Sequence, residues 1–75
     1  MTFEIRYNTV SRITGTTEDW GVRTVGEAVR HPRAKAALNL PDKYNIYVSN
    51  VQVDASHNIM EGQVITVEKV AATKG

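Results

Sequence analysis

The sequence predicts an α+β domain in which a mixed sheet of four to five strands carries one helical region packed across one face. Three observations predict this class. Apolar and polar residues alternate near both ends of the chain, as in strands with one buried face. The middle carries a helix-start motif followed by apolar residues at helical spacing. With 75 residues the chain has room for one domain and none for a deep catalytic cavity.

The first two strands are expected to form a hairpin. Every second side chain from residue 3 to residue 7 is apolar, namely Phe3, Ile5 and Tyr7. Residues 8–9 are suited to a turn, and residues 10–17 then predict a second strand rich in β-branched side chains. Gly15 within it indicates a bulge or a bend. Residues 18–21 break the pattern and are expected to be a loop.

The helical region begins at a capping box. The sequence TVGE at residues 24–27 places a threonine hydroxyl and a glutamate three residues apart, so that each satisfies a backbone N–H of the other. The apolar residues that follow the spacing of a buried helical stripe are Val25, Ala28, Val29 and Pro32.

Pro32 leaves two outcomes open, because proline removes a helical hydrogen bond. Either the helix kinks there, or a first helix stops near Arg30 and His31 and a second begins with Pro32 at its first position. Strong helix formers at residues 34–38 favour resumption of the helix. The helical region is expected to end by residues 39–42.

The remaining strands are predicted after the helical region. Residues 45–50 predict a third strand, and the alternation that begins at Tyr44 just before it points Tyr44 and Tyr47 to opposite sides. Residues 51–53 form either a short fourth strand or its edge. Residues 60–62 predict a turn in which Gly62 takes a positive φ. Residues 64–70 show the clearest strand pattern. The domain therefore spans residues 1–70, and residues 71–75 are expected to be a flexible tail.

Composition narrows the function. Nine basic residues stand against eight acidic ones, a net charge of +1, which gives little electrostatic reason for nucleic-acid binding. The absence of cysteine excludes disulfides and a cysteine metal site, and fits a cytoplasmic protein. No apolar run approaches the roughly 20 residues that cross a membrane. Glu4 and Arg6 interrupt the N-terminus, so we expect no signal peptide.

Three segments in order carry a resemblance to a known family. They are TVGEAV at residues 24–29, LNLP with IYVSN at residues 38–41 and 46–50, and MEGQVITV at residues 60–67. They are similar to the helix start, the helix exit with its following strand, and the last-strand turn of the β-grasp (ubiquitin-like) superfamily. Within it, the nearest likeness is to the small sulfur carriers of thiamin and molybdopterin biosynthesis.

The resemblance implies a β-grasp fold and a partner enzyme. Carriers of this type end in Gly-Gly, and an adenylating enzyme activates the terminal carboxylate for attack by sulfur or an amine. A thin tail can thread into that enzyme's active site. Here the chain ends Thr73-Lys74-Gly75, with a bulky lysine in place of the penultimate glycine. Gly75 is therefore either an activated carboxylate or simply the last residue of a loose tail.

Four further residues are candidates for binding a protein partner. Trp20 lies in a polar segment and is either a binding anchor or a cap on the small core. Tyr47 is the tyrosine expected on the solvent side of its strand. Arg30 and Arg33, with Lys35, form a basic cluster that either contacts an acidic surface or is the solvated face of a helix. His31 and His57 are the only histidines and are too few for a zinc site.

The leading hypothesis is a non-catalytic ubiquitin-like module that binds larger proteins through its sheet face. The alternative is a sulfur carrier or protein modifier activated at Gly75, and the second alternative is a small nucleic-acid-binding β-domain. No nucleophile with a neighbouring base and no phosphate-binding glycine loop is present, so we expect neither enzyme activity nor a cofactor.

Overall fold

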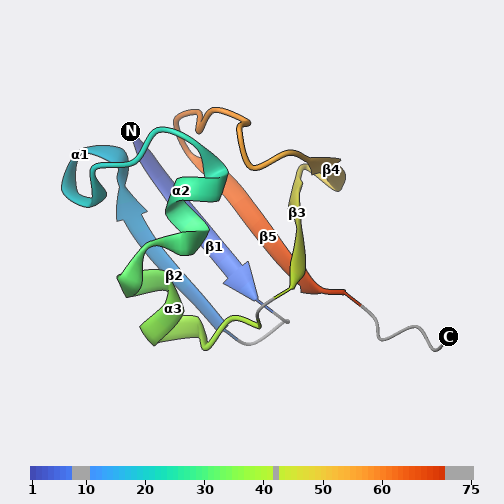
Figure 1. Ribbon diagram of the computed structural model, residues 1–75. Helices are drawn as coiled ribbons and strands as arrows, with labels where there is room; N and C mark the ends of the chain where they lie inside the picture. The colour runs from blue at the N-terminus through green and yellow to red at the C-terminus, as the bar shows by residue number, and fades with distance from the viewer. Residues whose placement is uncertain (8–10, 42, 71–75) are drawn as a thin grey trace, which may run out of the picture.

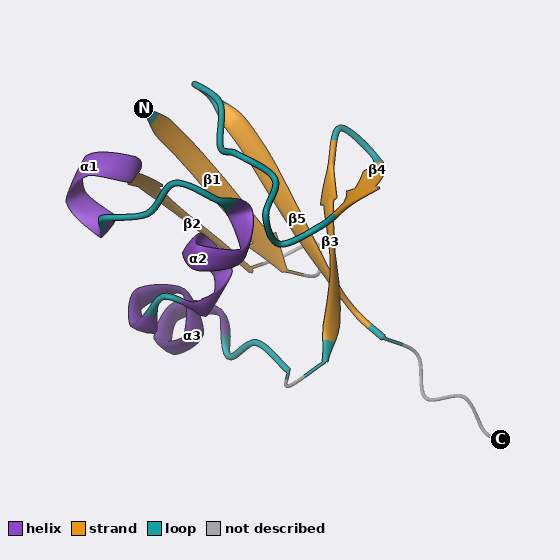
Figure 2. Cartoon of the chain, turned by 45° about the horizontal axis from the view of Figure 1, so that its top comes forward, coloured by secondary structure: helices purple, strands orange, loops and turns teal. Residues whose placement is uncertain are grey.

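Five strands and three short helices form two layers in the part of the chain that the structure describes, residues 1–7, 11–41 and 43–70 of a computed structural model. The elements are β1 (Thr2–Tyr7), β2 (Ser11–Thr16), α1 (Thr17–Trp20), α2 (Val25–Arg30), α3 (Pro32–Leu38), β3 (Tyr44–Val48), β4 (Val51–Val53) and β5 (Gln63–Lys69). The strands form one mixed sheet, and the helices lie on one side of it (Figures 1 and 2). The predicted α+β class is confirmed.

The sheet has the strand order β2-β1-β5-β3-β4. The two central strands, β1 and β5, run parallel, and each pairs antiparallel with its other neighbour (Figure 1). The side chains of Ile5, Ile65 and Val67 on these strands are completely buried beneath the helices. Apolar residues from every layer thus meet in one core, which lies entirely on the helical side of the sheet.

The expected loop at residues 18–21 is wrong, because the chain turns into helix α1 as soon as β2 ends. The Thr16 hydroxyl accepts a hydrogen bond from the Asp19 N–H at 3.0 Å and so caps this helix. The N-terminal ammonium of Met1 donates a hydrogen bond to the Glu18 carboxylate at 2.7 Å, and this ion pair connects the start of β1 to helix α1. The cap and the acidic residues of the first turn stabilise this helix, although it is too short to show helical periodicity in the sequence.

Gly15 marks neither a bulge nor a bend, which corrects the sequence-based interpretation. The β1–β2 ladder is continuous from Thr2 opposite Thr16 to Tyr7 opposite Ser11. A Cβ at position 15 would overlap the indole of Trp20. The glycine therefore provides the space in which the tryptophan ring lies on the sheet.

Trp20 is a core residue, only 5% exposed. Its ring meets the Phe3 ring edge to face with centroids 5.0 Å apart. The His31 ring lies tilted against it with centroids 4.7 Å apart. Of the two alternatives for Trp20, a binding anchor or a cap on the core, its buried position agrees with the cap.

The capping box is confirmed, and the second outcome for Pro32 is the correct one. The Thr24 hydroxyl accepts from the Glu27 N–H at 3.2 Å, and the Glu27 carboxylate accepts from the Thr24 N–H at 3.3 Å. Helix α2 ends at Arg30, and α3 begins with Pro32, where the His31 Nδ1 accepts from the Arg33 N–H at 3.1 Å. Pro32 is exposed, so it does not belong to the predicted buried stripe.

The third strand is shorter than predicted, because the chain reverses at Ser49 and Asn50. Both have positive φ, 53° and 66°, as in a two-residue hairpin turn, and β4 follows directly. The turn before the last strand is confirmed, with Gly62 at φ 73°. Over residues 1–7, 11–41 and 43–70, no helix has the length and apolar character needed to cross a membrane.

Gly15→Ala is expected to lower the free energy of unfolding by roughly 1–3 kcal/mol, because the added Cβ overlaps the Trp20 ring. Urea unfolding followed by circular dichroism measures this. Thr14→Ala, on the exposed side of the same strand, is the control and should change stability by less than about 1 kcal/mol. In combination with Trp20→Leu the loss should be smaller than the sum of the two single losses, and a strictly additive result contradicts the proposed overlap.

Stability is also expected to fall in acid. Hydrogen bonds from the backbone N–H groups of Arg23 and Thr24 hold the pKa of Glu27 below its ordinary value. The stabilisation is therefore present above the unfolded-state pKa, near pH 4, and is lost as the pH falls through the lower folded-state pKa.

Urea midpoints between pH 6 and pH 2.5 test this acid sensitivity. Glu27→Gln, which can still accept both hydrogen bonds, should show a shallower fall than the parent protein. Glu68→Gln, at an exposed position on β5, should keep the parent slope. Parallel curves for all three proteins would refute a contribution from Glu27.

Candidate functional site

The sheet face opposite the helices is the candidate site. Side chains alternate along each strand, so the residues that do not face the core project from this side. We call it the open face, and it consists of Glu4, Arg6, Arg12, Thr14, Asn45, Tyr47, Gln52, Val64, Thr66 and Glu68. None of the three helices in the described chain covers it (Figure 2).

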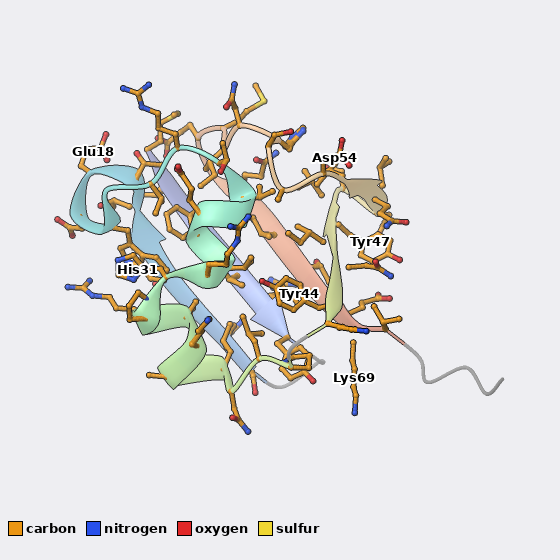
Figure 3. The ribbon with its side chains drawn as sticks, viewed as in Figure 1. Glu18, His31, Tyr44, Tyr47, Asp54 and Lys69 are labelled. Atoms are coloured by element: carbon orange, nitrogen blue, oxygen red, sulfur yellow. The ribbon has the colours of Figure 1, made fainter. Side chains whose placement is uncertain are left out.

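Tyr47 lies on the open face, as the sequence predicts. Tyr44 and Tyr47 leave β3 on opposite sides (Figure 3). Tyr44 packs against the core, whereas Tyr47 is half-buried and outside it. An aromatic side chain is therefore presented to solvent on the strand next to the β4 edge of the sheet.

One row of side chains crosses the open face from edge to edge. Strand register places Arg12 beside Arg6, Arg6 beside Thr66, and Thr66 beside Tyr47. Gln52 on β4 completes the row. At about 4.8 Å per strand the row spans roughly 19 Å. It is basic at the β2 end and aromatic towards the β4 end.

The basic end of the row brings two like charges together. Arg6 and Arg12 lie directly opposite each other on β1 and β2. Arg6 forms an ion pair with Glu4 on its own strand. Arg12 is exposed and has no ion pair within the described residues. The three side chains therefore carry a net positive charge, and Glu68 lies on the same face two residues beyond Thr66.

Two shallow hollows adjoin this row, and Gly62, Gln63 and Val64 border both. One, of about 330 Å³, lies towards β2 and is also lined by Thr14 and Gly15. The other, of about 540 Å³, lies between the Ser49–Asn50 turn and the loop before β5, and is lined by residues including Arg6, Ser49, Asn50, Met60 and Thr66.

The second hollow combines apolar and basic side chains with one carboxylate, that of Glu61, which accepts a hydrogen bond from the Thr2 hydroxyl. Met60 and Val64 are 63% and 37% exposed, so both offer apolar surface to this space. Arg6 borders the same space. The hollow can therefore receive an apolar group while a guanidinium binds an anionic one beside it.

The structure does not bring the sequence-predicted binding residues together. Arg30 and Arg33 are exposed on α2 and α3, in the layer opposite Tyr47. Trp20 lies in the core between them and the sheet. Gly75 lies outside the described residues. The basic cluster and Tyr47 therefore cannot form one contact surface.

Sequence reasoning missed Arg12, Val64 and Met60 as site residues. The missing information was strand register, which places residue 12 opposite residue 6. His31 caps α3, and His57 uses its carbonyl to accept from the Val25 N–H at 2.8 Å. Among the described residues, no group of three histidines or acidic side chains could hold a metal ion.

The geometry is the only guide to identity. Comparisons of the chain with models of known families, with curated proteins and with solved structures found no match. Function must therefore be argued from the open face and its chemistry.

Arg12→Thr is expected to raise the free energy of unfolding by about 0.5 kcal/mol, because it removes the cross-strand repulsion and adds a β-branched residue. Arg12→Lys keeps the charge and is the matched control, with no expected gain. Chemical denaturation in low salt measures both. A loss of stability in Arg12→Thr would show that Arg12 supports the fold through contacts of its own.

Proposed function

We propose that this protein is a non-catalytic, ubiquitin-like interaction module of the β-grasp fold, which binds a larger protein through its open face. The fold proposal is supported by the succession of elements: a hairpin, a helical region crossing the sheet, and a returning hairpin before the last strand. It is also supported by the capping box and the Gly62 turn. Both lie in segments whose sequence resembles that of β-grasp proteins, and both have a specific geometry.

The observation that carries the binding proposal is Tyr47 on a helix-free face, where its cross-strand neighbour Thr66 borders the hollow lined by exposed Val64 and Met60. Aromatic residues and methionine are enriched in protein interfaces, and hot spots commonly centre on an aromatic ring beside a pocket. The hollow next to Val64 provides such a pocket. A shallow, mixed surface of this kind suits a protein partner better than a small molecule, which needs deeper enclosure.

The proposed surface leaves out three of the four candidate residues named from the sequence. Trp20 supports the core from the other side of the sheet. Arg30 and Arg33 can contribute only to a separate contact on the helical layer. The carrier alternative depends on Gly75 and needs a test independent of the open face.

Site-specific photocrosslinking in the native cell tests the proposal. A benzophenone amino acid at position 47 is expected to give discrete adducts of higher mass, because this side chain lies in the contact. The same group at position 35, exposed on α3, is the matched control and should give few adducts.

Removal of residues 74–75 separates the two functions. If the open face is the contact, the position-47 adducts persist after this truncation, whereas a carrier bound through its terminus would lose them. Adducts from position 35 alone would contradict the open-face proposal. Tyr47→Ala should lower recovery of the crosslinked partner, measured with a second probe at position 52, by about tenfold or more.

A further inference from the structure

The opposition of Arg6 and Arg12 places two like charges side by side on neighbouring strands. Like charges directly opposite on neighbouring strands destabilise a sheet. Glu4 pairs with Arg6 and leaves Arg12 without an ion-pair partner among the described residues. Because the two arginines leave neighbouring points on the same face, a carboxylate bound between them can accept hydrogen bonds from both guanidinium groups.

The receptor for a carboxylate adjoins an apolar hollow. Arg6 belongs to the like-charged pair and also borders the space lined by Val64 and Met60. Tyr47 lies two strands from Arg6 in the same row, a distance of about 10 Å. An extended peptide covers this distance in about three residues. One short segment can therefore reach the guanidinium pair, the hollow and the tyrosine together.

We propose that the open face binds an acidic segment of its partner protein, with a carboxylate between Arg6 and Arg12 and a nearby apolar side chain in the hollow beside Val64 and Met60. This inference rests on the proposed function and names the chemistry of the partner. The acidic residue and the residue that contacts Tyr47 lie about three positions apart when the segment is extended across the strands.

Charge distribution favours a protein segment over a nucleic acid. The open face carries two arginines against two carboxylates, Glu4 and Glu68. A polyanionic strand needs a continuous basic stripe, and it would meet repulsion from both carboxylates. A peptide with one or two acidic groups places its charge only at the arginine pair.

Selection from a display library of random twelve-residue peptides on the immobilised protein tests the inference. Enriched peptides are expected to carry Asp or Glu within about three positions of a large apolar residue. Fluorescence anisotropy of the best peptide should show about tenfold weaker binding to Arg12→Ala. Arg12→Lys should bind with intermediate affinity, because it keeps the charge without the planar fork.

Controls separate this inference from the proposed function. Lys35→Ala removes a positive charge from α3 and should leave affinity unchanged. Affinity for the parent protein should fall as sodium chloride rises from 50 to 300 mM. Denaturation midpoints confirm that each variant is folded.

Several outcomes would overturn the inference. Peptides without acidic residues that bind Arg12→Ala normally but lose affinity for Tyr47→Ala would overturn it and leave the open-face function standing. Peptides sensitive only to Arg33→Ala would overturn both. No enrichment of acidic peptides over the input library, or tighter Arg12-dependent binding of a 20-nucleotide oligo(dT), would also reject an acidic peptide as the occupant.

Discussion

Packing of the Trp20 ring over Gly15 joins the two layers of this domain. The indole meets Phe3 of β1 on one side and His31 on the other, while the missing side chain at residue 15 lets it approach β2. Because a small domain buries only a modest fraction of its surface, losing such a contact removes much of its stability.

His31 extends this constraint to the helical region. Its ring packs on Trp20, and its Nδ1 caps the helix that starts at Pro32. The break between α2 and α3 is thus fixed by one side chain with two contacts. Proline alone left a kink and a restart equally possible, and the histidine cap selects the restart. The resulting bend lays both helices over the sheet (Figure 1).

The sequence predicted those parts of the fold that depend on local pattern. The capping box at Thr24, the alternation around Tyr47 and the turn at Gly62 are signals contained within a few residues. Helix α1 was missed because four residues show no helical period, and Gly15 was misinterpreted because its partner, Trp20, reaches it only after the layers pack. Such features depend on tertiary contacts, which a single segment does not contain.

The candidate site likewise contains residues that local pattern predicts and residues that only the folded structure brings together. Tyr47 followed from alternation, whereas the Arg6–Arg12 pair needed strand register and the hollow needed the position of the loop before β5. Arg30 and Arg33 were candidates because they form a basic cluster along the chain. They lie on the helical layer, whereas Tyr47 lies on the opposite face of the sheet, so a local cluster of charge did not identify the site.

The division of the sheet into a buried and an open face also separates the residues that stabilise the core from those of the proposed binding surface. Substitutions at Gly15 or Trp20 act on the core, whereas those at Arg12 act on a surface that contributes little to it. In a domain with a total stability of about 5–15 kcal/mol, even a small repulsion is a measurable fraction. Arg12 opposite Arg6 is unfavourable for folding, which a threonine at that position would serve better, and this cost is what the proposed anionic partner would account for.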